Sequence, residues 1–239
     1  MCGKIARREE PDDADKRLEG DFMKYFLIFG GIAALIAVII VAVRYYERKR
    51  TEALEKLARL LDYSFSAKGS DSLLASVNQF HLFTQGHRRR ITNVLTGRSD
   101  DTLVTIMDYR YTTGGGKNSH TWVQTVILYQ CSRLHLPVFT LRPENLFHKI
   151  GNAFGYQDID FDSNPTFSRQ YLLRGTEEQA IRNLFSDACL LYYEQHKGLC
   201  TEGTGDKLAF YRSSKRVPPP KLRSFIEEGS AVFRLFTTA

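Results

Sequence analysis

The sequence predicts an α+β protein with one N-terminal transmembrane helix and a helical stem, followed by an antiparallel β-sheet with C-terminal helices. Three patterns support this prediction. Residues 25–43 carry no charged side chain, residues 80–141 contain short segments rich in Val, Ile, Thr and Tyr, and apolar residues recur at helical spacing after residue 176. Strands that precede helices as a group, rather than alternating with them, are typical of the α+β class.

Four segments follow from the composition. A disordered polar tail is predicted for residues 1–22, because they hold seven acidic and five basic residues with few apolar ones. Met23 begins the sequence MKYFLIFGG, which has the form of the start of a small bacterial membrane protein, so we interpret the tail as an over-called start. The remaining segments are a transmembrane helix with its interfacial flanks at 23–46, a juxtamembrane helical stem at 47–69 and a soluble α+β domain at 70–239.

The apolar run is long enough to cross a bilayer. As a helix, its 19 residues rise about 1.5 Å each and so approach the ~30 Å of a hydrocarbon core. No small-residue cleavage pattern follows the run, so a retained anchor is predicted rather than a removable signal peptide. Cationic and aromatic residues typical of the membrane interfaces flank it: Lys24, Tyr25, Arg44, Tyr45, Tyr46, Arg48, Lys49 and Arg50.

The charges beside the run predict its orientation. Four cations fall within residues 44–50, whereas Lys24 is the one cation within residues 18–24. Because cations favour the cytoplasmic side, we expect a single-pass protein of the bacterial inner membrane whose C-terminal domain is cytoplasmic. The small residues Gly30 and Ala34, four positions apart, would permit self-association of the helix.

Periodicity then predicts the soluble elements. The stem has Leu54, Leu57, Ala58 and Leu61 at helical spacing, and is expected to end at Lys68 and Gly69. Four antiparallel strands are predicted at 89–97, 101–113, 119–131 and 136–141, and the GGGKN sequence should close the hairpin between the second and third. Further on we expect one helix from a capping box at Thr176 to about Lys197, a short hairpin over 199–212, and a last amphipathic helix from Leu222 to Phe236.

The search for chemistry gives one weak cluster. Asp158, Asp160 and Asp162 lie on one side of an extended segment, where they would gather a hard cation. The alternative is that these carboxylates bond to nearby backbone amides or pair with Arg169 and Arg174. The chain lacks HExxH, GxSxG, SxxK and CxxC motifs, and the glycine run before Lys117 departs from the phosphate-binding loop pattern. No catalytic residue and no cofactor is predicted.

The basic residues suggest partners. The whole excess of +6 lies after residue 44, with dense stretches at 87–90 and 211–223. Anionic lipid head groups fit a cluster beside a membrane helix, whereas nucleic acid is disfavoured because the charge is modest and no binding motif accompanies it. A protein partner and a homo-oligomer formed through the transmembrane helix remain alternatives.

A resemblance is visible in three stretches: MDYRYTTGGGKNSHTWVQTV at 107–126, LRPENLFHKIG at 141–151 and YLLRG at 171–175. Here the sequence resembles uncharacterised bacterial single-pass membrane proteins that carry a domain of unknown function. The resemblance implies a bacterial inner-membrane location and supplies no activity. The function predicted is a membrane-anchored binding or scaffold module. The alternative is a membrane-tethered hydrolase or metal-dependent enzyme that uses carboxylates near residues 144–162, with Glu144, His148 and the aspartates as candidates.

Overall fold

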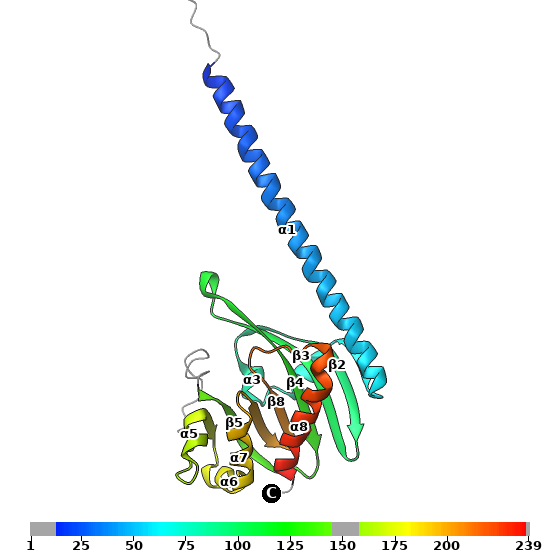
Figure 1. Ribbon diagram of the computed structural model, residues 1–239, viewed down its shortest axis with the longest axis vertical. Coiled ribbons are helices and arrows are strands. Elements are labelled where there is room, and N and C mark those ends of the chain that lie inside the picture. Colours follow the sequence, from blue (N-terminus) through cyan, green and yellow to red (C-terminus); the bar gives the residue numbers. More distant parts are fainter. Residues whose placement is uncertain (1–12, 145–157, 238–239) are drawn as a thin grey trace, which may run out of the picture. The chain divides into compact units, whose positions relative to one another are not determined.

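The computed structural model describes residues 13–144 and 158–237, with side chains from residue 24 onward. The chain divides into two compact units, which part between Arg50 and Thr51. The first unit consists of the N-terminal part of helix α1 (Asp13–Leu60), drawn in blue in Figure 1. Between residues 25 and 43 its large apolar side chains have exposed fractions of 46–69%. Within the described residues, this is the one helix long and apolar enough to cross a membrane.

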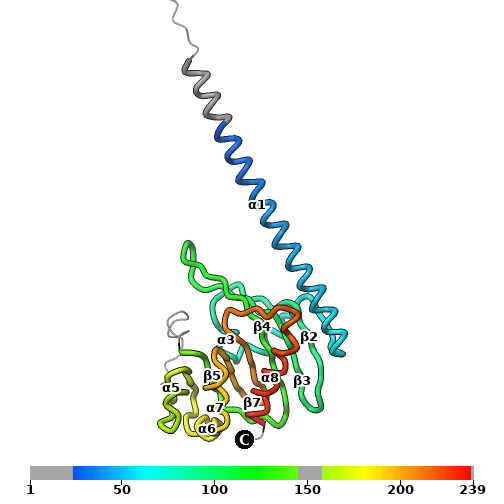
Figure 2. The backbone as a smooth tube through the Cα atoms, viewed as in Figure 1, coloured from blue at the N-terminus to red at the C-terminus, as the bar shows by residue number. Residues whose placement is uncertain are grey.

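The second unit is built on one antiparallel sheet of eight strands, which confirms the α+β class (Figure 1). The strand order is β1-β2-β3-β4-β8-β7-β5-β6, so the β7–β8 hairpin lies between β4 and β5. Figure 2 follows the same backbone as a tube. The strands are β1 (Ser64–Lys68), β2 (His87–Ser99), β3 (Thr102–Thr113), β4 (His120–Cys131), β5 (Leu136–Pro143), β6 (Tyr171–Gly175), β7 (Cys200–Gly205) and β8 (Lys207–Tyr211).

The four predicted strands and the predicted 199–212 hairpin are confirmed as β2 to β5, β7 and β8. The glycine run closes the β3–β4 hairpin as predicted, through the 3-10 turn η1 (Gly116–Asn118). Gly114 has a φ of 72°, and a Cβ atom there would lie 2.4 Å from the carbonyl oxygen of Asn118. The turn therefore requires glycine at this position.

Helices cover both faces of the sheet. On one face, α8 lies across β4 and β8, and together with α5, α6, α7 and the Leu54 and Ala58 side chains of α1 it encloses the larger core (Figure 1). On the other face, the segment containing α2 and α3 covers a smaller core rich in aromatic rings. These helices are α2 (Asp71–Ser76), α3 (His81–Thr84), α5 (Pro165–Gln170), α6 (Glu178–Leu184), α7 (Asp187–Gln195) and α8 (Leu222–Thr237), the last preceded by the turn η3 (Pro219–Lys221).

Two predicted helices differ from the structure. The stem helix ends at Leu60, where Asp62 takes a φ of 56°, and residues 64–68 pair with β2 as strand β1 instead of continuing the helix. The helix predicted from Thr176 is two helices, because Phe185 leaves the helical region and buries its ring while Ser186 caps α7. The predicted capping box is wrong: α6 starts after Glu177, which makes no side-chain capping bond.

A buried carboxylate ties the start of the second unit to the sheet. Thr51 donates to Oδ1 of Asn93 over 2.9 Å, and Asn93 donates to Oδ2 of Asp108 over 2.9 Å. Asp108 also accepts from Thr125 at 3.0 Å and pairs with Nε of Arg216 at 3.2 Å. Asn93 sits at a bulge in β2 with a φ of 51°, a conformation that asparagine tolerates better than most residues. This network joins α1, the three strands β2, β3 and β4, and the loop after β8.

Candidate functional site

A cavity of about 100 Å³ lies where β5, β6 and β7 meet the segment that leads into α3. Its walls are apolar at Phe80, Val138 and Leu172, and its polar groups include His81, Arg142 and Glu202. The three polar residues have exposed fractions of 6%, 5% and 1%, although arginine and glutamate side chains are almost never fully buried unless they are paired. We therefore take this cavity as the candidate functional site.

Strand register brings these residues together. Side chains alternate along a strand, so Thr140 and Arg142 of β5 face the cavity while Phe139 points into the core on the other side. Thr140 lies directly opposite Glu202 of β7 on one side and Arg174 of β6 on the other. Gly203 allows the Phe139 ring to pack closely, since a Cβ atom there would lie 2.2 Å from that ring.

Glu202 is held in a hydrogen-bonded position. Its Oε1 accepts from the Tyr211 hydroxyl at 2.7 Å, and the backbone amide of Leu82 donates to both oxygens at 3.2 Å. Burial raises the pKa of Glu202 to about 7, against the opposing effects of the Tyr211 hydroxyl, the Leu82 amide and the Arg142 charge. The carboxyl group therefore changes its charge near neutral pH.

His81 is neutral at that pH. Burial lowers its pKa to about 4, and the positive charges of Arg142 and Arg174 lower it further in the same direction. The imidazole thus contributes a polar but uncharged wall to the cavity near pH 7.

Arg142 brings a positive charge into the cavity wall. Its Nη1 atom is buried, and no described residue offers it a hydrogen-bond acceptor. Arg174, by contrast, pairs through Nε with Oδ1 of Asp158 at 2.5 Å. A buried arginine nitrogen without an acceptor is costly, because guanidinium groups lose strong bonds to water on burial. Within the part of the chain that the structure describes, the Nη1 atom of Arg142 therefore lacks a hydrogen-bond acceptor.

These groups suit binding and proton exchange better than nucleophilic chemistry. Cys189 and Cys200 are buried, and burial raises the pKa of each thiol to about 12. A thiol with such a pKa is a poor nucleophile at neutral pH. The combination of Arg142 with a carboxyl group that titrates near 7 instead suits an anionic ligand.

The predicted aspartates are spread over different contacts. Asp158 reaches Arg174 at the rim of the cavity, as one of the two alternatives had it, and the backbone carbonyl of Asp160 accepts from Arg182 at 2.6 Å. Among residues 24–144 and 158–237, no three His, Cys, Asp or Glu side chains gather closely enough to hold a metal ion. Glu144 is exposed, and His148 lies outside the described residues. A metal site that includes Asp162 stays a prediction.

The predicted interface residues all lie on α1. Within this helix the ammonium group of Lys49 lies 5.7 Å from the Tyr45 ring centroid, and the Tyr45 and Tyr46 rings are 6.0 Å apart. Lys24 and Tyr25 are exposed at the start of the apolar run, as are Arg44, Arg48 and Lys49 after it. Their role at a membrane interface stays a prediction.

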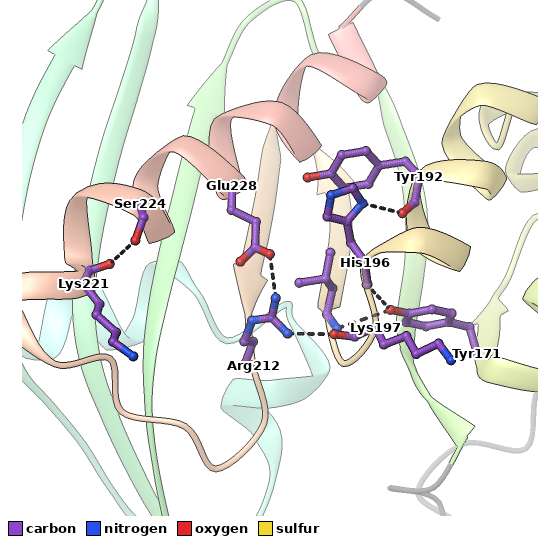
Figure 3. Close-up of polar contacts among 9 residues, drawn as sticks. Tyr171, Tyr192, His196, Lys197, Arg212, Lys221, Ser224 and Glu228 are labelled. Atoms are coloured by element: carbon purple, nitrogen blue, oxygen red, sulfur yellow. Dashed lines mark hydrogen bonds and ion pairs between the residues drawn. The ribbon is translucent and has the colours of Figure 1, made fainter.

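Two arginines of the basic stretch near the C-terminus make internal contacts. Arg212 donates to the carbonyl of Lys197 at 2.7 Å and to Glu228 at 2.5 Å, so it connects the end of α7 to α8 (Figure 3). Close by, the Tyr171 hydroxyl donates to the carbonyl of His196 at 2.8 Å. Because Arg216 pairs with Asp108, both arginines of the loop after β8 are committed to internal ion pairs.

Comparisons with known proteins add one structural neighbour. No protein-family model and no curated protein matches the sequence. The crystal structure of the mycobacterial trehalose monomycolate transport factor A, TtfA, is similar with a TM-score of 0.57 and 13% sequence identity. The similarity covers 80% of this chain and 94% of that chain. At this identity the likeness shows a shared fold.

Sequence reasoning missed the three polar residues of the cavity. A weak signal was present for Glu202, a charged residue inside the predicted 199–212 hairpin, whereas Arg142 follows directly after the predicted 136–141 strand. Their meeting depends on β7 pairing with β5, which are separated by 56 residues between Pro143 and Cys200. Local periodicity carries no information about such a pairing.

Proposed function

We propose that the protein is a membrane-anchored binding module whose second unit holds a small ligand in the Arg142–Glu202 cavity. The observation that carries the proposal is the buried Arg142 guanidinium, which faces a cavity without an acceptor for Nη1 among the described residues. Pockets with apolar walls and a few converging polar groups are the usual form of small-molecule sites. The transport-factor role of TtfA agrees with a module that binds rather than transforms its ligand.

The membrane part of the proposal places α1 in the bacterial inner membrane and the second unit on the cytoplasmic side. The exposed apolar side chains of residues 25–43 support an environment other than water. The four cations of residues 44–50 support the orientation. The resemblance to bacterial single-pass membrane proteins supports the location.

Anionic lipid head groups are the proposed surface partner. Besides the cations of residues 44–50, the exposed Arg90 and Arg110 lie directly opposite each other on β2 and β3. Like charges in this position repel, and an anion between them would relieve the repulsion. Both arginines are on the sheet face that also carries Asp108, to which Thr51 is linked through Asn93.

The anchor can be tested with charge substitutions in α1. We expect Ile36→Arg combined with Ile39→Arg to move the full chain from membranes to the soluble fraction, because each arginine at a helix centre costs about 2.5–3.5 kcal/mol on insertion. The measurement is alkaline carbonate extraction of cells expressing each form. Leu60→Arg is the control, since Leu60 is 77% exposed and follows the apolar run on the same helix. Wild-type protein extracted by carbonate would contradict the anchor.

The cavity is tested by filling it. Thr140→Trp places a large ring at the cavity wall, whereas Leu191→Trp adds the same ring at a position that is 50% exposed on α7. We expect that compounds which raise the melting temperature of the full-length protein in detergent do so for wild type and Leu191→Trp and fail to do so for Thr140→Trp. A screen of anionic, neutral and cationic metabolites in which no compound separates the two variants would contradict a ligand-binding cavity.

A further inference from the structure

We infer that the cavity binds the carboxylate group of a small organic acid through Arg142, and that this ligand enters together with a proton carried by Glu202. The inference rests on the proposed function of the cavity as a binding site and names the class of its ligand. It is supported by the state of Arg142, the size and walls of the cavity, and the groups around Glu202.

Among residues 24–144 and 158–237, no acceptor bonds to the buried Nη1 atom of Arg142. The nearby carboxylates are already engaged, since Glu202 accepts from Tyr211 and Leu82, and Asp158 pairs with Arg174. Arginine presents several N–H donors in a planar fork that matches the two oxygens of a carboxylate. A carboxylate in the cavity would supply the acceptor that the buried Nη1 atom lacks among the described residues.

Size and polarity favour a small monoanion. A volume of about 100 Å³ is smaller than the ~150 Å³ engineered cavity that admits benzene, so the enclosed part of the ligand has only a few heavy atoms. Phe80 and Leu172 provide apolar surface for the carbon attached to the carboxylate, and Val138, which is 47% exposed, marks the open side. A phosphate dianion would bring a second negative charge beside Glu202 and is disfavoured.

The groups that face Glu202 show which side chain takes up the proton. These are the His81 and Leu82 backbone amides from the α3 segment, Arg142 from β5, the Tyr109 and Tyr111 hydroxyls from β3, Cys200 from β7 and the Tyr211 hydroxyl from β8. The pKa of His81 is about 4 and that of Cys200 about 12, while burial raises the pKa values of the three tyrosines above their usual range.

Glu202, with a pKa of about 7, is therefore the group among them that changes charge near neutrality. Two carboxylates in one small cavity repel, and the protonated form of one can instead donate a hydrogen bond to the other. The proton comes from solvent, so an anion and a proton enter together and the net charge of the cavity is unchanged.

The test uses three probes of matched size on the full chain in detergent micelles. These are 3,3,3-trifluoropropionate, its neutral amide and the cation 3,3,3-trifluoropropylamine, each followed by ¹⁹F NMR titration.

We expect the carboxylate to bind to wild type, and Arg142→Gln to weaken carboxylate binding by tenfold or more. Its affinity should fall by up to tenfold per pH unit above pH 7. In Glu202→Gln this pH dependence should disappear while binding persists, because the amide carries no titrating charge. Arg142→Lys, which keeps the charge, should bind more tightly than Arg142→Gln.

Each of the other outcomes contradicts either the carboxylate inference or the proposed binding function. If the neutral or cationic probe binds as tightly as the carboxylate and Thr140→Trp blocks it, the carboxylate inference fails and the binding function stands. If no probe of any charge binds, the proposed function itself fails. The inference is overturned if the carboxylate binds to Arg142→Gln as tightly as to wild type. It is also overturned if the affinity of wild type for the carboxylate is independent of pH between 6 and 9, a measurement that holds even where one variant does not fold.

Discussion

Replacing Asp108 with alanine is expected to lower the free energy of unfolding of the second unit by about 3–5 kcal/mol. Asp108 is 3% exposed and accepts from Asn93, Thr125 and Arg216. Its removal leaves the guanidinium of Arg216 and the amide of Asn93 without this acceptor in a place that water reaches poorly. The loss should appear in denaturant unfolding of the detergent-solubilised chain, followed by the fluorescence of Trp122, the single tryptophan.

Asp101→Ala is the matched control. Asp101 makes two hydrogen bonds to Arg133, at 2.8 and 2.9 Å, yet the side chains are 40% and 59% exposed. Because water and salt screen such a pair, its removal should change stability far less than removal of Asp108. Equal effects of the two substitutions would contradict a structural role for the Asp108 network. Since Thr51 connects to Asp108 through Asn93, the same substitution should also loosen the last turns of α1.

The fold was predictable where short-range patterns determine it. The strands from β2 to β5 are predicted by β-branched and aromatic residues bounded by glycine and polar turns. Helix α8 is predicted by apolar residues that recur with a period of 3.6. Strand β1 has no such signal: its sequence SFSAK is short and mostly exposed, and it exists because β2 offers an unpaired edge. The break between α6 and α7 is likewise tertiary, since it lets Phe185 reach Phe139 and Phe236.

The candidate site was less predictable than the fold. The sequence places Glu202 within a predicted hairpin and Arg142 just after a predicted strand, but whether each lies in the cavity or in solvent depends on which face of the sheet is covered and by what. Here the segment containing α2 and α3 covers this face. Its Leu82 amide donates a hydrogen bond to Glu202, which is 120 residues away in the sequence. Asp158 was visible as a candidate ligand for a cation, and the structure instead pairs it with Arg174 at the cavity rim.

The opposite pKa shifts of Glu202 and His81 predict an unusual dependence of stability on pH. Glu202 has an ordinary pKa of 4.5 and a folded value of about 7, so its contribution to stability is full below pH 4.5 and is lost as pH rises towards 7. His81 has an ordinary pKa of 6.5 and a folded value of about 4, so its contribution is full above pH 6.5 and is lost as pH falls towards 4. Between pH 4.5 and 6.5 the two slopes oppose each other and largely cancel.

Single substitutions should therefore reveal a dependence of the unfolding free energy on pH that largely cancels in the wild type. Relative to wild type, Glu202→Gln is expected to gain about 2–3 kcal/mol of unfolding free energy between pH 4.5 and 7, since each pKa unit corresponds to about 1.4 kcal/mol. His81→Gln should show the mirror image and gain on acidification over pH 6.5 to 4.

The measurement is denaturant unfolding at half-unit steps of pH, with Glu178→Gln as control, because Glu178 is in an exposed i,i+4 pair with Arg182. A Glu202→Gln curve parallel to that of wild type would mean that Glu202 ionises normally in the folded protein, and the proton-coupled part of carboxylate binding would fall with it. Curves that diverge in opposite directions for Glu202→Gln and His81→Gln would establish that the cavity holds one acid and one base, both uncharged near pH 6. In that state the positive charge of Arg142 is the one charge of the three groups, and an incoming anion meets it without repulsion.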